Sequence, residues 1–164
     1  RQFGHSGSSA CRRGKKGGPD HAIGRSRGGL SSKINAVVDE AGLPVRLSIT
    51  PGQASDKTAA PGLIDSLSRT LHVVADRGYD ARALVERIEA RGATAHIPTQ
   101  RDRKVQRSVD RSVYRKRNLV ERYFNKIKHF RRIATRFDKL ARNYLAAVAL
   151  ASVRLWTRYY ESTT

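Results

Sequence analysis

Repeating patterns of apolar and polar residues occur in several parts of the chain, and each pattern predicts a kind of element. Residues 33–39 are rich in β-branched side chains, and residues 43–50 alternate apolar with polar positions after a glycine-containing turn. These features predict an antiparallel hairpin with one buried face. Residues 57–68 and 81–92 have the spacing expected of helices, and a glycine ends the second of them.

Two short apolar runs flank the second of these helices. Residues 71–76 form an apolar run that ends in a carboxylate, and residues 94–98 form the other run. The first run is typical of a central strand buried on both faces, and a strand–helix–strand step of this size predicts parallel pairing in an α/β sheet. Residues 99–113 are mostly polar and basic and predict a loop, whereas residues 114–135 and 139–159 predict two closing helices.

The first 31 residues follow none of these patterns. They are rich in Gly, Ser, Arg and Lys and contain few large apolar side chains. Such a segment buries too little surface to repay the entropy of ordering, so we expect a basic arm or loop over 1–31 and one folded core over 32–164. The longest apolar run, residues 144–153, is shorter than the roughly 20 residues that cross a bilayer, so we expect no membrane span.

Charge narrows the classes of function. The chain has 33 Lys and Arg against 14 Asp and Glu, a formal net charge of +19. This balance argues against most metabolic enzymes and favours a polyanionic partner, with nucleic acid ahead of an acidic membrane. Fourteen of the basic residues lie between Arg101 and Arg136, a stretch with only three acidic residues. The single cysteine, Cys11, excludes a disulfide framework and a zinc site built from several cysteines.

The expected helix over 114–135 has two distinct faces. At about 100° per residue, one narrow stripe carries four polar side chains, which are Tyr114, Arg117, Glu121 and Lys128. Apolar side chains cover the opposite face, namely Leu119, Val120, Tyr123, Phe124, Ile127, Phe130 and Ile133. Taken alone, such a stripe is more often a solvated face with one Arg117–Glu121 ion pair than a functional site.

The spacing of those four residues matches a known signature. The pattern Tyr114-x2-Arg117-x3-Glu121-x6-Lys128 resembles the Y-x2-R-x3-E-x6-K signature of bacterial insertion-sequence transposases with a DDE catalytic core. The segment 74–80 resembles the part of those proteins that carries their second catalytic Asp. Three further stretches match in the same order, at 24–30, at 50–53 with Asp56, and at 129–139. The resemblance spans about residues 17 to 159.

The resemblance implies a fold and a site. The fold is an α/β, RNase H-like mixed sheet flanked by helices. The resemblance implies that Asp76 and Glu121 are catalytic residues that bind Mg²⁺ or Mn²⁺. Both ions take carboxylate oxygens as ligands. It also implies that Tyr114, Arg117 and Lys128 contact the transposon end. The alternative for Asp76 is a structural role as a helix N-cap or turn residue before the following glycine.

One expected carboxylate is missing from the sequence. The family's first catalytic Asp lies on the opening strand of the fold, just before the region that matches residues 17–30. Residues 1–18 contain no Asp or Glu, and Asp20 and Asp39 do not correspond to that position. We therefore expect the opening strand to be truncated or to come from an upstream segment, and a pseudogene remnant fits the sequence equally well.

These considerations predict part of a bacterial DNA transposase, cytoplasmic and nucleoid-associated. The expected partners are double-stranded DNA at the transposon ends and target, an upstream transposase segment, and further copies of the chain. Two alternatives stay open: an inactive DNA-binding remnant that could inhibit full-length transposase and, more distantly, a structural RNA-binding protein. The transposase interpretations predict that the carboxylates of Asp76 and Glu121 lie within about 4–8 Å of each other.

Overall fold

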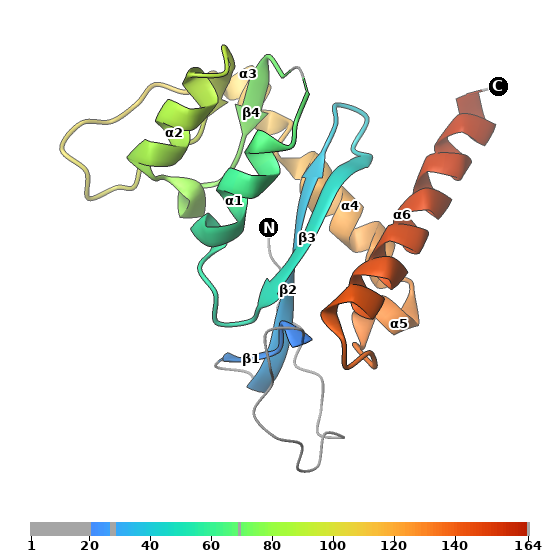
Figure 1. Cartoon of the computed structure of the whole chain (residues 1–164). Coiled ribbons are helices and arrows are strands. Elements are labelled where there is room, and N and C mark those ends of the chain that lie inside the picture. Colours follow the sequence, from blue (N-terminus) through green and yellow to red (C-terminus); the bar gives the residue numbers. More distant parts are fainter. Residues whose placement is uncertain (1–20, 27–28, 69, 164) are drawn as a thin grey trace.

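The computed structural model describes residues 21–26, 29–68 and 70–163. In these residues the strands form two separate sheets, one antiparallel with three strands and one parallel with two. Figure 1 shows the antiparallel hairpin in the middle, with the parallel pair and two helices on one side and the C-terminal helices on the other. The mixed α/β class expected from the sequence is therefore confirmed, whereas the RNase H-like arrangement stays a prediction.

The hairpin predicted from the sequence is present. Strand β2 (Gly29–Val38) pairs in antiparallel fashion with β3 (Pro44–Pro51). The turn between them is closed by Asp39, whose Oδ1 accepts hydrogen bonds from the backbone N–H groups of Ala41 and Leu43, each at 2.9 Å. Gly42 follows the turn with φ of 78°, a left-handed conformation that glycine adopts without strain.

The last part of the expected basic arm is regular strand instead of loop. Strand β1 (Gly24–Ser26) pairs with the first residues of β2. A distant arginine holds the segment before β1, because Arg136 donates hydrogen bonds to the backbone carbonyls of His21 and Ala22. Hydrogen bonds instead of apolar burial fix this segment, which is why the hydrophobic pattern did not indicate it. Residues 1–20 and 27–28 of the arm lie outside the described residues.

The predicted strand–helix–strand step is also present. Strands β4 (His72–Val74) and β5 (Thr94–His96) are parallel, and α2 (Arg82–Glu89) connects them. Helix α1 (Asp56–Asp65) precedes β4 and contacts α2. The expectation of a central strand buried on both faces is wrong for the described residues. Within them β4 pairs only with β5, and His72 is exposed.

The single helix expected over 114–135 is three shorter helices. These are α3 (Arg111–Arg115), α4 (Asn118–Lys128) and α5 (Arg131–Ala134). Backbone hydrogen bonds between residues three apart tighten the junction of α3 and α4. Phe130, with φ of −81° and ψ of 104°, is extended and separates α4 from α5. Because both breaks are changes in backbone geometry within one apolar pattern, the sequence did not reveal them.

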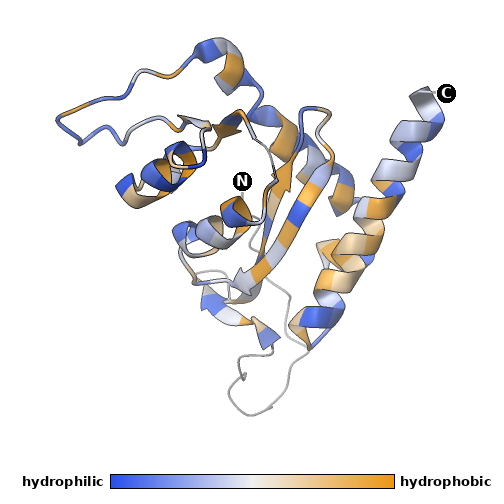
Figure 2. Cartoon of the chain, turned by 45° about the horizontal axis from the view of Figure 1, so that its top comes forward, coloured by the Kyte–Doolittle hydropathy of each residue, from blue (hydrophilic) through white to orange (hydrophobic). Residues whose placement is uncertain are grey.

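The final helix, α6 (Ala141–Thr163), agrees with the prediction for 139–159. It packs with α4, α5 and the hairpin in one hydrophobic cluster, called the hairpin cluster, whose buried members are Ile34, Tyr123, Phe124, Ile127, Ile133, Tyr144, Val148 and Ala151. Figure 2 shows hydrophobic residues along the hairpin and over the N-terminal half of α6. In the described parts of the chain, no helix combines the length and apolar character that a membrane span requires.

A second, separate cluster surrounds the parallel strands. It is called the parallel-strand cluster, and its buried members are Ala60, Ile64, Leu84, Val85, Ile88, Ala93 and Ile97. These residues come from α1, from α2 and from the segment around β5. The described residues therefore build two hydrophobic clusters, one on each side of the molecule, instead of a single core.

Candidate functional site

Asp76 lies two residues after the end of β4 and caps a short 3₁₀ helix, η2 (Arg77–Tyr79). Its Oδ1 accepts a hydrogen bond from the backbone N–H of Gly78 at 2.8 Å. The structural role considered for this residue is thus present. Because capping uses one of the two carboxylate oxygens, this role is compatible with a ligand role for the same side chain.

A second carboxylate lies close to Asp76. A β-carbon placed on Gly78 would lie 2.9 Å from Oδ1 of Asp76 and 3.9 Å from Oδ2 of Asp56, so these two oxygens are at most about 7 Å apart. Asp56 is the first residue of α1, and it accepts a hydrogen bond from Nζ of Lys33 on β2 at 2.9 Å. The fold therefore gathers two carboxylates where α1 begins and β4 ends. The sequence placed Asp56 in a matching stretch but gave it no role.

The charge of this pair affects a neighbouring hydroxyl. Burial raises the pKa of Tyr79 to about 12, and the negative charges of Asp56 and Asp76 contribute in the same direction. Tyr79 consequently keeps its proton at neutral pH and can act only as a hydrogen-bonding group there.

Three of the four stripe residues come together at the junction of α3 and α4. Nη1 of Arg117 lies 2.7 Å from Oε1 of Glu121, and its guanidinium lies 5.9 Å from the centre of the Tyr114 ring. The side chains of the ion pair are 29% and 23% exposed, so water only partly screens them. The expected grouping of Tyr114, Arg117 and Glu121 is confirmed despite the break in the helix. Lys128 is the last residue of α4 and is half-buried.

A large cavity is lined by one residue of each group, Asp76 and Arg117. It has a volume of about 820 Å³ and lies between residues 36–38 of β2 and residues 72–76 at β4; we call it the central cavity. Asp76 is on one wall and Arg117, the ion-pair partner of Glu121, is on another. The structure thus brings Asp76 and Arg117 to the same cavity, while the separation of the Asp76 and Glu121 carboxylates stays a prediction.

The donor chemistry of the site suits a divalent metal only in part. Carboxylate oxygens, which Asp56, Asp76 and Glu121 provide, are the ligands that Mg²⁺ and Mn²⁺ prefer. In the described residues, however, no group of three or more His, Cys, Asp or Glu side chains is close enough to hold a metal ion. The donors are therefore of the right kind, but in the described part of the chain they do not complete a site.

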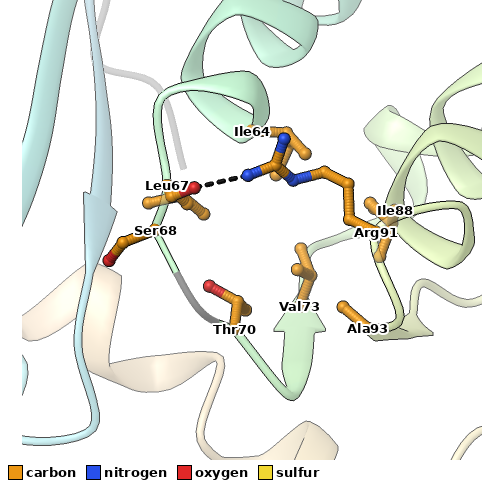
Figure 3. A pocket seen from close by; sticks show the side chains of 8 residues that line it. All are labelled: Ile64, Leu67, Ser68, Thr70, Val73, Ile88, Arg91 and Ala93. Carbon is orange, nitrogen blue, oxygen red and sulfur yellow. Dashed lines mark hydrogen bonds between the residues drawn. The ribbon is translucent and has the colours of Figure 1, made fainter.

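A smaller pocket adjoins the central cavity. Figure 3 shows it between the end of α1, β4 and the residues that follow α2, with the Arg91 side chain reaching across to the carbonyl of Leu67. Its volume of about 20 Å³ is enough for roughly one water molecule. It is too small for a substrate.

A buried carboxylate holds the basic loop that follows β5. The Asp80 side chain is completely buried. Its Oδ2 accepts a hydrogen bond from the backbone N–H of Gln100 at 2.9 Å and lies 3.0 Å from Nε of Arg103. Its Oδ1 forms an ion pair with Arg107. Burial alone would raise the pKa of Asp80. The hydrogen bonds from Gln100 and Arg107 and the charges of both arginines outweigh it and lower the pKa below its usual value. Sequence analysis missed this role, although a carboxylate between an apolar run and a helix was a visible signal.

Basic side chains cover the surface around the candidate site. The exposed ones between the loop after β5 and the end of α5 are Arg101, Arg103, Lys104, Arg111, Arg115, Lys116, Arg122, Lys126, Arg131 and Arg132. Figure 2 shows hydrophilic residues along most of this loop. Arg136 differs from them because it is half-buried and packs over the Tyr144 ring at 4.9 Å, so it has a structural role. The exposed set is a source of positive charge that a polyanion could contact.

Comparison with known proteins agrees with the resemblance seen in the sequence. The sequence model of a family described as "Transposase DDE domain" matches residues 5–156. A protein of Brucella ovis named "putative transposase for insertion sequence element IS6501" is 38% identical over 130 residues, which are 79% of this chain and 100% of that protein. No solved structure matches significantly.

Proposed function

Because the chain belongs to the transposase DDE domain family, we propose that it takes part in metal-dependent cleavage and transfer of DNA strands at the ends of an insertion sequence. The family uses a divalent metal. The observation that supports the proposal most is that Asp76 and the partner of Glu121 line one cavity beside a strongly basic surface.

In this proposal Asp76 and Glu121 provide oxygen ligands for Mg²⁺ or Mn²⁺. A bound divalent ion stabilises the attacking and leaving oxygens of phosphodiester transfer. A further carboxylate must come from outside the described residues, because those residues do not complete a site. We therefore expect the 164-residue chain alone to bind DNA but to cleave it at no measurable rate, and an upstream transposase segment to restore cleavage.

The proposed DNA contacts come from Tyr114, Arg117 and Lys128. Arg117 is held by Tyr114 and Glu121 at the edge of the cavity, a position from which its guanidinium could contact a phosphate. The exposed arginines and lysines around it add contacts to the DNA backbone that carry no sequence information. The partners would be double-stranded DNA at the transposon ends and target, and further copies of the chain. The nucleoid in the bacterial cytoplasm would be the place of action.

A second candidate function is an inactive DNA-binding protein that inhibits complete transposase. The incomplete set of carboxylates in the described residues favours it. Family membership favours both candidates over a structural RNA-binding protein. The two differ in one respect: only the first predicts that Asp76 and Glu121 are needed for cleavage once the site is complete.

A binding experiment tests the proposed contact surface. The probe is a duplex with the terminal sequence of the element that encodes this chain, compared with a scrambled duplex of equal length. We expect Arg117→Gln to weaken binding to the terminal duplex by at least tenfold, and Arg82→Gln to leave it unchanged. Arg82 is the matched control, because it forms an ion pair at 2.7 Å with Glu86, four residues on, on the exposed face of α2. Equal effects of both substitutions would contradict the assignment of Arg117.

A further inference from the structure

We propose that β1 and residues 29–31 of β2, which we call the ribbon, form a second DNA-contacting element of the chain. In this element Arg25 binds a phosphate of the duplex and Leu30 makes an apolar contact in a groove. The proposal rests on the proposed function only in taking duplex DNA as the ligand, and it gives neither residue a part in cleavage. Its test measures binding, so its failure and a failure of the cleavage assay can be told apart.

The ribbon continues the hairpin beyond the end of β3. Strand β3 pairs with residues 32–38 of β2, whereas β1 pairs in the described residues only with residues 29–31. The ribbon is therefore two strands wide. Figure 1 shows it at the end of the hairpin, beyond the point where α1 begins. A groove of duplex DNA is wide enough to admit an element of this kind.

Hydrogen bonds hold the base of the ribbon in place. Arg136 donates to the backbone carbonyls of His21 and Ala22, which lie just before β1. The same guanidinium donates to Oγ of Ser32 on β2, and that hydroxyl donates to the carbonyl of Ala22. These bonds tie both strands to the segment that follows α5. The ribbon therefore keeps a fixed direction relative to the hairpin cluster.

One face of the ribbon is covered by the turn that follows β3. Gly24 and Ser31 lie directly opposite each other in the register. A β-carbon on Gly24 would overlap Oε1 of Gln53 in this turn, and one on Gly52 would overlap Oγ of Ser31. Both positions consequently require glycine. The close fit brings together two of the stretches that match the family signature, and it leaves only the other face of the ribbon open to a ligand.

The next pair of residues points to that other face and is exposed. Arg25 and Leu30 are directly opposite each other in the register, so their side chains are neighbours on one face. Both residues are exposed, and Leu30 is 48% exposed. A guanidinium beside an exposed apolar side chain suits duplex DNA, because the guanidinium can bind a phosphate while the apolar group contacts a sugar or a base.

This face lies on the side of β2 where α5 packs. Side chains an even number of residues apart on a strand share a face, so Leu30 shares its face with Ile34. Ile34 packs with Ile133 of α5 in the hairpin cluster. Helix α5 also carries the exposed Arg131 and Arg132. The ribbon thus adds to the basic surface around the candidate site instead of forming an isolated patch.

Strand β2 connects the ribbon to the candidate carboxylates. Leu30 precedes Lys33 by three residues, which is about 10 Å of strand, and Nζ of Lys33 lies 2.9 Å from Oδ1 of Asp56. Asp56 and Asp76 have oxygens at most about 7 Å apart. Leu30 is therefore no farther than about 25 Å from Asp76, which is less than one turn of DNA at about 34 Å. A duplex that ends at Asp76 can contact the ribbon within its first turn.

Binding to the terminal duplex at several salt concentrations distinguishes the two contacts. Arg25→Gln removes one phosphate contact, so the slope of log affinity against log salt should become less steep by about one, whereas Arg25→Lys should keep the slope. Leu30→Gln should weaken binding by about fivefold at every salt concentration and leave the slope unchanged, because an apolar contact releases no counterions.

Two controls match these variants. Arg82→Gln removes an exposed arginine from α2, and Leu150→Gln removes an exposed leucine from α6, where Leu150 is 72% exposed. Neither should change the affinity or the slope. Thermal melting by circular dichroism verifies that each variant is folded; if Leu30→Gln is not, Leu30→Thr replaces it, since threonine suits a strand.

Hydroxyl-radical footprinting locates the contact on the DNA. Arg25→Gln should lose protection of the backbone within about ten base pairs of the element end and keep it elsewhere. An unchanged salt slope in Arg25→Gln, wild-type affinity in Leu30→Gln, or loss of protection only beyond the first turn would each overturn the proposal. So would a change from dimer to monomer in Leu30→Gln at unchanged DNA affinity, because a second copy would then occupy the ribbon. Absence of cleavage by complete transposase with these binding results intact would contradict the proposed function alone.

Discussion

Replacing Asp80 with asparagine tests the inference that this one buried carboxylate holds the basic loop. Breaking a buried charge pair by removing one partner costs about 3–5 kcal/mol. The side chains of Arg103 and Arg107 are 43% and 30% exposed, so water can hydrate both once they are released. We therefore expect a smaller loss in the free energy of unfolding for Asp80→Asn, of about 2–3 kcal/mol.

Urea unfolding at pH 7 measures this loss. For a protein of this size the midpoint should fall by about 1–2 M urea with an unchanged m value. Asp65→Asn is the matched control, because Asp65 forms an ion pair with Arg87 at 3.1 Å and both side chains are about half exposed. The control should change the free energy of unfolding by less than about 1 kcal/mol.

The pH dependence of the difference in unfolding free energy between the wild type and Asp80→Asn provides a second check. The folded-state pKa of Asp80 is lowered, so its contribution is complete above the unfolded-state value and is lost as the pH falls through the folded pKa. The wild type and Asp80→Asn should therefore differ fully at pH 6, and the difference should shrink as the pH falls below the ordinary Asp value of about 3.9. A difference that grows as the pH falls, or a loss at pH 7 no larger than that of Asp65→Asn, would refute the role given to Asp80.

Two further predictions concern charge. Affinity for duplex DNA should fall by orders of magnitude between roughly 50 and 200 mM salt, because phosphate contacts release counterions. A filter-binding titration measures this fall, and a salt-independent affinity would contradict the prediction. Burial and the charge of His72, whose Nδ1 is 3.1 Å from Nε2 of His96, lower the pKa of His96. Because the unfolded chain then binds more protons below about pH 6.5, stability should decrease as the pH falls from 7 to 5. His96→Gln should flatten that slope, and an unchanged slope would exclude His96 as its source.

The elements that local periodicity determines could be predicted from the sequence. The hairpin could be predicted because its apolar and polar residues alternate with a two-residue period, and the parallel step because two short apolar runs flank a helical pattern. The division of the expected helix over 114–135 could not be predicted, because its apolar face continues through both breaks. The shared face of Tyr114, Arg117 and Glu121 was still correct, since the junction of α3 and α4 stays close to helical geometry.

Features that depend on contacts between distant segments could not be predicted. Strand β1 follows a segment held by Arg136, more than a hundred residues away in the sequence. The ion pairs of Asp80 join a turn to a loop more than twenty residues later.

The most direct test of the proposed function is cleavage of a terminal duplex by complete transposase that contains this chain, in Mg²⁺ and in EDTA. We predict Mg²⁺-dependent nicking at the element end by the wild type and none by Glu121→Gln, while both bind the duplex. Glu86→Gln is the matched control, because Glu86 also forms an ion pair with an arginine four residues before it. This variant should cleave at the wild-type rate. Cleavage by Glu121→Gln at the wild-type rate would contradict the assignment of Glu121 and, with it, the proposed catalytic site.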